Sequence, residues 1–228
     1  MSQHSRSIET QLTLPVHLNY LLHLPTGYGE DKAKKWPVIL FLHGAGERGN
    51  DLQMVRKHGI PKIVEQCSGF PFITLSPQCP ENTWWVAESI IAGLDALLND
   101  AAAHLAIDPD RIYLTGLSMG GMGSWQLAAL YPDRFAALAP ICGPCPWGFG
   151  FPERAVALRH LPTWVFHGAK DPIVPLSDSG SIVKALQGAG GNVRFTIYPE
   201  ADHDSWSETY HNPELYEWML QHTRVKVS

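Results

Sequence analysis

The stretch that decides the fold is residues 111–121, RIYLTGLSMGG. Its apolar start, residues 112–114, is typical of a buried strand, and the apolar side chains that follow the stretch recur three and four apart, as in a helix. Gly-x-Ser-x-Gly stands between the two patterns. A strand that turns directly into a helix holds the central residue, Ser118, in a strained and exposed conformation. We expect glycine at 116 and 120 because a Cβ on either side would collide across the turn.

Strands and helices alternate on both sides of this turn. Apolar runs predict strands at 36–42, 72–75, 112–114, 135–141, 161–167 and 193–198, and helical spacing predicts helices at 60–67, 90–105, 122–129, 177–187 and 213–222. Two further strands, at 8–14 and 16–22, alternate apolar with polar residues around Pro15 and are expected to be antiparallel at the sheet edge. This order predicts an α/β fold: a mainly parallel sheet of about seven or eight strands, helices on both faces, and a single domain over residues 1–228 without a large cap.

Composition excludes several classes of partner. The 228 residues are 45% hydrophobic and carry a net charge of −5 without a Lys/Arg-rich run. The charge therefore gives no support for binding to nucleic acid or to anionic membranes. The apolar run at 38–42 is far too short to span a bilayer. Residues 1–7 are polar and lack the apolar segment of a signal peptide, so we expect a cytoplasmic protein. The oligomeric state is left open.

The four cysteines include a Cys-Gly-Pro-Cys pattern, Cys142 to Cys145. The same spacing is a redox motif where it opens a helix, but here Pro-Trp-Gly follows, which cannot form a first helical turn. Cys67 and Cys79 have no matching spacing, and no His/Cys pattern completes a zinc site. We therefore interpret these cysteines as buried or loop thiols and expect no metal.

A serine hydroxyl needs a base to become a nucleophile, and the base needs a carboxylate to orient it. On a sheet of this kind the partners follow the serine in the order acid, then histidine, in loops after later strands. Asp171 follows the strand at 161–167 and is stiffened by neighbouring prolines. His203 follows the strand at 193–198. The sequence therefore predicts Ser118, His203 and Asp171 as nucleophile, base and orienting acid.

Other histidines and acids are weaker candidates. His43 and His167 each end a strand before a glycine, and we expect both to be buried and hydrogen-bonded. The remaining candidates on helices or polar connections are expected at the surface: His58, His104, His160, His211 and His222. Asp202 and Asp204 flank the base, but neighbours on an extended chain point to opposite faces. Asp178 is interpreted as part of a helix N-terminal cap.

A tetrahedral intermediate also needs two backbone N–H donors. One is expected at Met119, directly after the serine, and the other in the loop after residues 38–42, at Ala45 or alternatively at Gly46. The same loop carries Glu47 and Arg48, for which an ion pair that braces the loop is favoured over direct contact with substrate.

The connection between 141 and 161 is short and rich in Pro and Gly, which disfavours a helical lid, so the site should be open and shallow. Four loop tryptophans are candidates to line it: Trp84, Trp85, Trp147 and Trp206. For any one of them, simple packing of a loop is an equal alternative.

Five segments together carry a family resemblance: FLHGAGERG, SPQCPENTWW, DPDRIYLTGLSMGG, VFHGAKDPIVP and YPEADHDSW. Over about residues 36–206 the chain resembles compact bacterial α/β-hydrolase carboxylesterases of the phospholipase/carboxylesterase group. It is more distantly similar to dienelactone hydrolases and to the catalytic domain of prolyl oligopeptidases. Dienelactone hydrolases have Cys where this chain has Ser118, which favours ordinary ester chemistry. The loop reads His-Gly-Ala-Gly rather than the His-Gly-Gly-Gly of some esterases, which leaves the oxyanion donors less defined than the triad.

The resemblance implies a serine carboxylesterase that acts on a small-molecule, short-acyl ester through an acyl-enzyme, without metal or organic cofactor. The nearest alternative is a serine peptidase of the prolyl oligopeptidase type. A binding module without activity is a third possibility, which the combination of triad and serine turn disfavours. Turnover of a p-nitrophenyl ester against an aminoacyl anilide separates the three.

Overall fold

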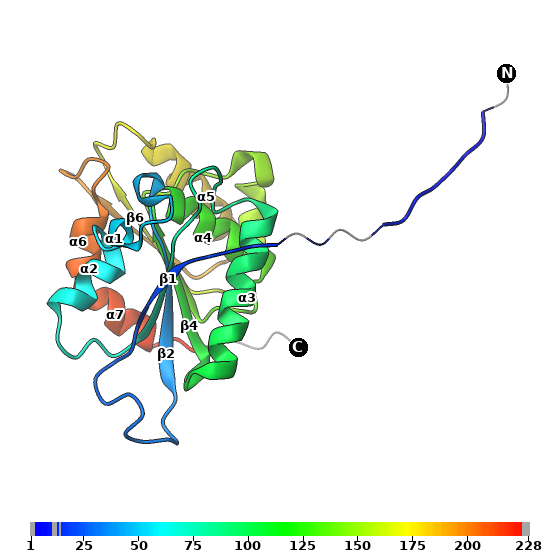
Figure 1. Ribbon diagram of the computed structural model, residues 1–228. Helices are drawn as coiled ribbons and strands as arrows, with labels where there is room; N and C mark the ends of the chain where they lie inside the picture. The colour runs from blue at the N-terminus through cyan, green and yellow to red at the C-terminus, as the bar shows by residue number, and fades with distance from the viewer. Residues whose placement is uncertain (1–2, 11–12, 14, 225–228) are drawn as a thin grey trace.

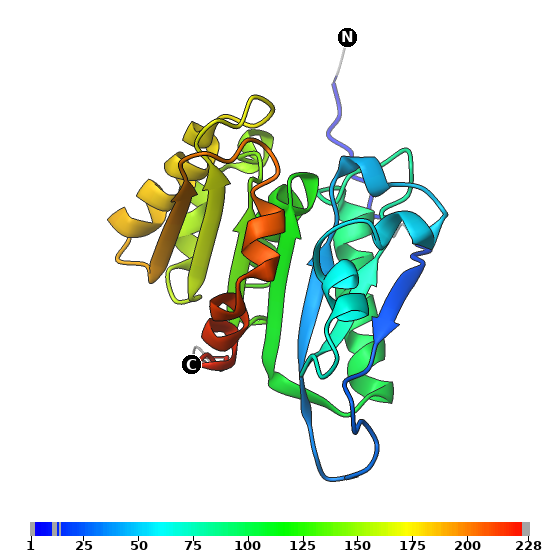
Figure 2. The ribbon, with the colours of Figure 1, turned by 90° about the vertical axis from the view of Figure 1, so that its left-hand side faces the viewer.

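The computed structural model describes residues 3–10, 13 and 15–224, and within these residues it contains one seven-stranded sheet in the order β1-β3-β2-β4-β5-β6-β7. Figure 2 shows the strands side by side from β1 (blue) to β7 (brown). β1 pairs antiparallel with β3 at one edge, and all other neighbours are parallel. The strands are β1 (Tyr20–His23), β2 (Trp36–Leu42), β3 (Ile73–Pro77), β4 (Ile107–Leu117), β5 (Ala137–Ile141), β6 (Thr163–Gly168) and β7 (Val193–Tyr198).

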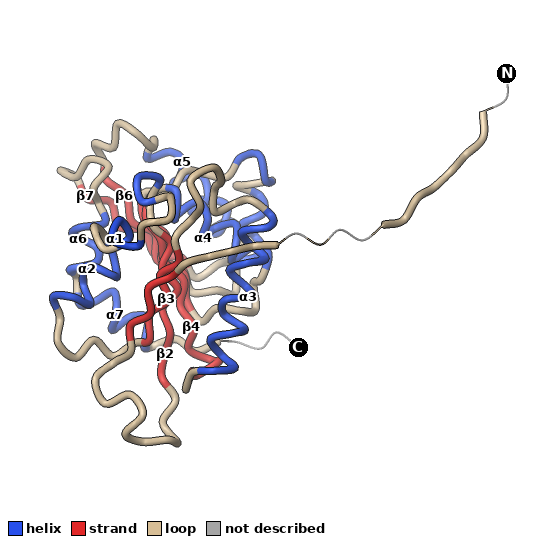
Figure 3. The backbone as a smooth tube through the Cα atoms, viewed as in Figure 1, coloured by secondary structure: helices blue, strands red, loops and turns tan. Residues whose placement is uncertain are grey.

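Helices cover both faces of the sheet (Figures 1 and 3). One face carries α3 (Glu88–His104), α4 (Met119–Leu130) and α5 (Leu176–Gly188), and the other carries α1 (Leu52–Val55), α2 (Gly59–Gln66), α6 (Trp206–His211) and α7 (Pro213–Leu220). Short 3₁₀ helices lie in loops at η1 (Ala45–Glu47), η2 (Trp147–Phe149) and η3 (Glu153–Leu158).

The core is divided into two layers by the sheet. In β2, Val38, Leu40 and Leu42 pack toward α3 and α4, and the alternate residues Ile39 and Phe41 pack toward α2 and α6. Every residue of β2 is buried because this strand is covered on both faces, which is why its sequence is a continuous apolar run. The expected mainly parallel α/β sheet is therefore confirmed.

The N-terminal region differs from the expectation of two strands. Among the described residues, only Tyr20–His23 of this region forms a strand, and Ile8 is 91% exposed. Part of the strand expected at 8–14 lies outside the described residues. Val16 and Leu18 instead pack against Gly93 of α3, where a Cβ would meet both side chains at 2.7 and 3.1 Å. The register of β1 covers only residues 74–77 of β3, so the rest of the alternating pattern has no neighbouring strand to pair with.

β4 begins at Ile107, five residues before the start of the strand predicted at 112–114. Trp36 pairs with Ile107 and Val38 with Ile112, so the extra residues of β4 form an irregularity between two paired stretches. An ion pair between Arg111 and Asp108, 2.7 Å long, closes this irregularity. The helices α1 and α6 were not expected, because four and six residues are too few to show a helical period.

The connection from β5 to β6 contains η2 and η3 and, within the described residues, no α-helical cap. The expected absence of a cap domain over the sheet is confirmed for this part of the chain. No helix among the described residues is both long and apolar enough to cross a membrane.

Candidate active site

Ser118 lies on the sharp turn between β4 and α4. Its backbone angles, φ 52° and ψ −116°, are outside the regions that a residue with a side chain normally adopts. A Cβ at Gly116 would overlap the carbonyl of Gly120, and a Cβ at Gly120 would overlap the carbonyl of Leu42. The strained serine and the need for both flanking glycines are therefore confirmed.

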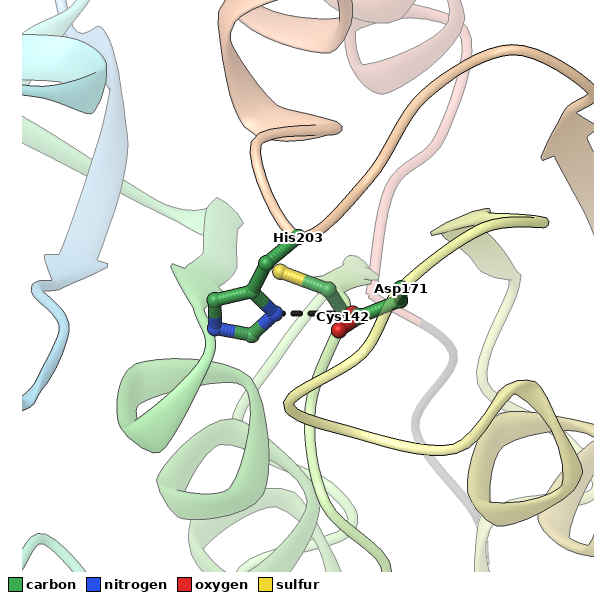
Figure 4. A group of neighbouring side chains, drawn as sticks. All are labelled: Cys142, Asp171 and His203. Carbon is green, nitrogen blue, oxygen red and sulfur yellow. Dashed lines mark hydrogen bonds and ion pairs between the residues drawn. The ribbon is translucent and has the colours of Figure 1, made fainter.

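The structure brings Ser118, His203 and Asp171 together at the carboxyl ends of β4, β7 and β6. The serine Oγ lies 2.9 Å from Nε2 of His203, and Nδ1 of His203 lies 2.7 Å from Oδ2 of Asp171 (Figure 4 draws this second contact). Because a carboxylate only accepts, Nδ1 donates its proton to Asp171 and leaves Nε2 to accept the proton of the serine hydroxyl. This is the arrangement in which an imidazole can act as a general base.

The carboxylate of Asp171 is held on both oxygens. Its Oδ1 accepts the backbone N–H groups of Ile173 (2.8 Å) and Val174 (2.9 Å), while Oδ2 accepts from His203. Burial pushes the pKa of Asp171 upward, but the hydrogen bonds from His203, Val174 and Ile173 outweigh it and leave this pKa below its usual value. Asp171 is therefore ionised at neutral pH, as an orienting acid must be.

A second histidine, His167, also contacts this carboxylate. His167 is fully buried at the end of β6, and its Nε2 lies 3.0 Å from the carbonyl oxygen of Val174 and 3.2 Å from Oδ2 of Asp171. Because the carbonyl only accepts, Nε2 carries the proton, and Nδ1 accepts from the hydroxyl of Ser179 at 2.8 Å. Burial lowers the pKa of His167, so the ring is neutral. Its burial is confirmed; its contact with Asp171 was not expected, although the spacing His-x-x-x-Asp was visible.

The acids that flank His203 serve the local turn. Asp202 Oδ1 accepts the N–H of Asp204 at 2.9 Å, and Asp204 Oδ1 accepts the N–H of Ser207 at 3.0 Å at the start of α6. Asp178 does not cap α5 as expected. Its Oδ2 accepts the N–H of Cys145 at 2.9 Å and so ties the β5–β6 connection to this helix.

His43 supports the loop after β2 and is buried and hydrogen-bonded, as expected. Its Nε2 accepts the N–H of Cys79 at 2.9 Å, so the proton is on Nδ1, which donates to the carbonyl of Gly44 at 2.6 Å. Burial lowers the pKa of His43 to about 4. The ring is therefore neutral at physiological pH and holds the loop rather than a substrate.

Trp85 does not line the substrate site, contrary to the prediction. Its side chain is completely buried, its Nε1 donates to the carbonyl of His43 at 2.9 Å, and its ring lies 5.0 Å from the His43 ring. With its only polar group satisfied inside the protein and no surface exposed, Trp85 packs beneath the loop instead of facing a substrate.

The other three tryptophans lie near the carboxyl edge of the sheet. The ring of Trp206 meets the His203 ring edge to face, with 5.3 Å between centroids. Trp84 and Trp147 are 46% and 55% exposed, in the connections after β3 and β5. Contact of these three with substrate stays a prediction.

The two predicted oxyanion donors, Met119 and Ala45, are each the first residue of a helix. Met119 is the first residue of α4 and Ala45 the first of η1, and the N–H groups at a helix start have no acceptor within the helix. Their strands β4 and β2 are adjacent and parallel, with Leu42 paired to Gly116. Both N–H groups therefore lie at the same edge as the serine. Gly46 follows Ala45 in η1 and remains the alternative donor.

The expected ion pair between Glu47 and Arg48 is wrong: among the described residues no ion pair joins them. Arg48 follows η1 in an extended conformation and turns outward, where its guanidinium donates to the carbonyls of Ala45 (3.0 Å) and Thr83 (3.4 Å) and stacks 4.9 Å from the Trp84 ring. Glu47 turns inward and is buried, with Oε2 at 3.9 Å from Nδ1 of His43. Arg48 thus braces the loop through carbonyl groups and an aromatic ring.

Cys142 lies at the end of β5, beside the acid and the base. All four cysteines are in the described part of the chain and none forms a disulfide; Cys142, Cys145 and Cys79 are buried and Cys67 is exposed. Burial raises the pKa of Cys142 and of Cys145 to about 12, so both thiols stay protonated. The interpretation as unpaired buried or loop thiols is confirmed.

A largely parallel sheet, covered by helices on both faces and carrying a serine on the turn between a central strand and its helix, is the α/β-hydrolase fold. Within that fold the chain matches the phospholipase/carboxylesterase family over residues 66–212. It therefore belongs to this family of carboxylic ester hydrolases.

Individual relatives agree with this assignment. The crystal structure of a thermostable esterase is similar with a TM-score of 0.78 and 34% identity, over 92% of this chain and 60% of that chain. A probable carboxylesterase of Oryza sativa subsp. japonica is 27% identical over 89% of this chain and 84% of its own length. A bifunctional acetylxylan esterase/xylanase of Neocallimastix patriciarum is 25% identical over 80% of this chain. The chain spans only 26% of that larger protein.

Proposed function

We propose that this protein is a serine carboxylesterase that hydrolyses short-acyl esters through an acyl-enzyme on Ser118. The observation that carries the proposal is the continuous hydrogen-bonded line from Ser118 Oγ through His203 to Asp171, with links of 2.9 and 2.7 Å. A serine with only a structural role would not need a strained backbone together with an imidazole and an ionised carboxylate in one hydrogen-bonded line.

In the first half-reaction, Nε2 of His203 takes the hydroxyl proton as Ser118 Oγ attacks the ester carbonyl carbon. Negative charge develops on the carbonyl oxygen and is received by the N–H groups of Met119 and Ala45. Asp171 stabilises the imidazolium that forms. His203 then gives its proton to the leaving alcohol, and the acyl group stays on the serine. Water hydrolyses the acyl-enzyme by the same steps.

The preference for short acyl groups is supported by what surrounds the serine. The β5–β6 connection offers the short helices η2 and η3 rather than a lid that could enclose a long chain. Trp206, packed against His203, supplies an apolar wall close to the reacting atoms. A small apolar acyl pocket with an open alcohol side is the arrangement that these features favour.

The test is the turnover of p-nitrophenyl butyrate by the wild-type protein and by Ser118→Ala. We expect the variant to lose about three or more orders of magnitude in kcat/KM, because removal of a triad member disables attack. Its thermal unfolding should match that of the wild type, since only a hydroxyl is removed. Ester turnover within tenfold of wild type in the variant would reject Ser118 as nucleophile. Faster turnover of an aminoacyl anilide than of the ester would favour the peptidase alternative.

A further inference from the structure

Cys142 has no part in the proposed reaction, yet it lies against two residues that do. Cys142, Asp171 and His203 each offer one metal-ligating atom, and these three atoms lie within 4.8 Å of one another. Figure 4 shows the thiol beside the imidazole, with Asp171 on the same side. The three side chains come from three connections, after β5, β6 and β7.

The donor types select the metal. A thiolate, an imidazole and a carboxylate are the ligands that bind Zn²⁺, and a thiolate disfavours Mg²⁺ and Ca²⁺. In a tetrahedral zinc site, with bonds of about 2.0–2.3 Å, ligand atoms are about 3.5 Å apart. His203 Nδ1 and Asp171 Oδ2 are already 2.7 Å apart, so shifts of about 1 Å would bring all three atoms to that spacing. We propose that Cys142, Asp171 and His203 form an inhibitory zinc site.

Charge balance supports a buried site of this composition. The thiol of Cys142 loses its proton to solvent when it binds the metal, and Asp171 is already ionised. One thiolate and one carboxylate then neutralise the two positive charges of Zn²⁺. The side chains of Cys142 and Asp171 are fully buried. A cluster without net charge avoids the large free-energy cost of an uncompensated charge at such a place.

Zinc at this place would stop the reaction through the imidazole tautomer, an inference that rests on the proposed function. The nitrogen on the side of Asp171 is Nδ1, because Nε2 faces Ser118. A neutral imidazole that binds metal through Nδ1 carries its proton on Nε2. That nitrogen can then donate to the serine oxygen but cannot accept its proton, so general-base catalysis is lost.

The route to the site passes His203. Of the three side chains, His203 is the one that solvent reaches, at 19% exposure, while the carboxylate of Asp171 and the thiol are covered. The ring stands on the loop between β7 and α6, so the metal has to pass this ring to reach the two covered ligands. We therefore expect inhibition to develop over time after zinc is added.

The activity test compares wild type with Cys142→Ser and with Cys145→Ser, a matched change of another buried thiol in the same loop. Without metal, all three should hydrolyse p-nitrophenyl butyrate at similar rates. After incubation with Zn²⁺, we expect wild type and Cys145→Ser to lose activity, with apparent inhibition constants at least about tenfold lower than that of Cys142→Ser. Mg²⁺ at the same concentration should leave all three active. Equal sensitivity of wild type and Cys142→Ser to zinc would overturn the proposal.

A second measurement follows binding without any turnover. Cd²⁺ is added to Ser118→Ala, which keeps all three ligands, and the ultraviolet charge-transfer absorption of a cadmium thiolate is recorded. Cys67 is exposed and could bind Cd²⁺ by itself, so the comparison is made in a Cys67→Ser background. We expect a band that disappears with Cys142→Ser and persists with Cys145→Ser; its absence overturns the site. If instead the band is present and the wild-type protein hydrolyses no ester, the zinc site stands and the proposed function fails.

Discussion

Nε2 of His167 lies 3.2 Å from Oδ2 of Asp171, so the carboxylate that orients the proposed base is itself held between two histidines. One, His203, is partly exposed and faces the serine. The other is fully buried and fixed by Ser179 and by the carbonyl of Val174. Because the buried ring is neutral, it positions the carboxylate without neutralising its charge. We expect this contact to give His167 a positioning role in the proposed reaction.

The role of His167 can be tested with a variant that keeps an N–H donor and one that does not. We expect His167→Leu to lower kcat about fivefold with little change in KM, because one contact to a charged group is worth about 1 kcal/mol. His167→Gln, whose amide can still donate, should retain more of the activity. Thermal unfolding separates this effect from lost stability. If both variants lost the same activity, or if only KM changed, the positioning role would be wrong.

Asp171→Asn should reduce kcat/KM by about three to four orders of magnitude while the fold is kept. An amide in this position favours the imidazole tautomer with its proton on the wrong nitrogen. Asp204→Asn is the matched control, because the Asp204 carboxylate accepts hydrogen bonds from Ser207 at the start of α6. Steady-state ester kinetics and circular dichroism measure both effects. Greater damage from Asp204→Asn than from Asp171→Asn would remove the assigned role of Asp171.

Two Gly→Ala changes, one in the strained turn and one inside a helix, should have opposite effects on stability. Gly120→Ala should abolish activity and greatly reduce stability, because the new methyl group would overlap the backbone carbonyl of Leu42. Gly180 lies inside α5, where an added Cβ would meet nothing within 4 Å. Gly180→Ala should therefore raise the unfolding free energy by about 0.5–1 kcal/mol. Urea unfolding of both variants checks the pair; a stable and active Gly120→Ala would contradict the packing described for the turn.

The buried histidines predict a loss of stability in acid. Burial lowers the pKa of His43 from 6.5 to about 4, so between these pH values the unfolded chain binds a proton that the native ring does not. The stability gained from the neutral ring is complete above pH 6.5 and is lost as the pH falls toward 4. For His43 alone this amounts to about 3 kcal/mol at the lower pH. His167 changes stability in the same direction.

Urea unfolding at a series of pH values between 7 and 4 measures this effect. In His43→Gln the residue no longer titrates, so its unfolding free energy should fall less over the same range, even if it is lower at pH 7. If the unfolding free energy of both proteins fell equally with pH, the pKa of His43 would not be lowered in the native state.

The short β5–β6 connection, which carries only η2 and η3, predicts a dependence of the rate on acyl length. We expect kcat/KM to be highest for acetyl to butyryl p-nitrophenyl esters and to fall about tenfold or more by decanoyl, which corresponds to about 1.4 kcal/mol of transition-state binding. Bulky alcohol groups should be tolerated. Rates that rise steadily toward long acyl chains, or activation at a lipid–water interface, would contradict this prediction and indicate a deep acyl-binding groove.

Local patterns in the sequence alone predicted the sheet, the turn at Ser118 and the three residues of the triad. The limits of β2 and β7 are those predicted from their runs of apolar or alternating residues. A strand that helices cover needs apolar side chains on each covered face, and this need appears directly in its sequence. The turn at Ser118 was predicted equally well, because only glycine fits at positions 116 and 120 on either side of it. Asp171 and His203 were selected by chain order, because the loops after parallel strands meet at one edge of the sheet.

Only the tertiary structure decided which side chains meet at that edge and in which direction they turn. Trp84 and Trp85 are neighbours in sequence, yet one faces solvent and the other packs beneath His43. The contact of Asp171 with His167 and its closeness to Cys142 depend on how the ends of β5, β6 and β7 are placed beside one another. Local patterns report the period and burial of one element at a time. Contacts between side chains of different elements depend on packing across the sheet, which no single stretch of sequence contains.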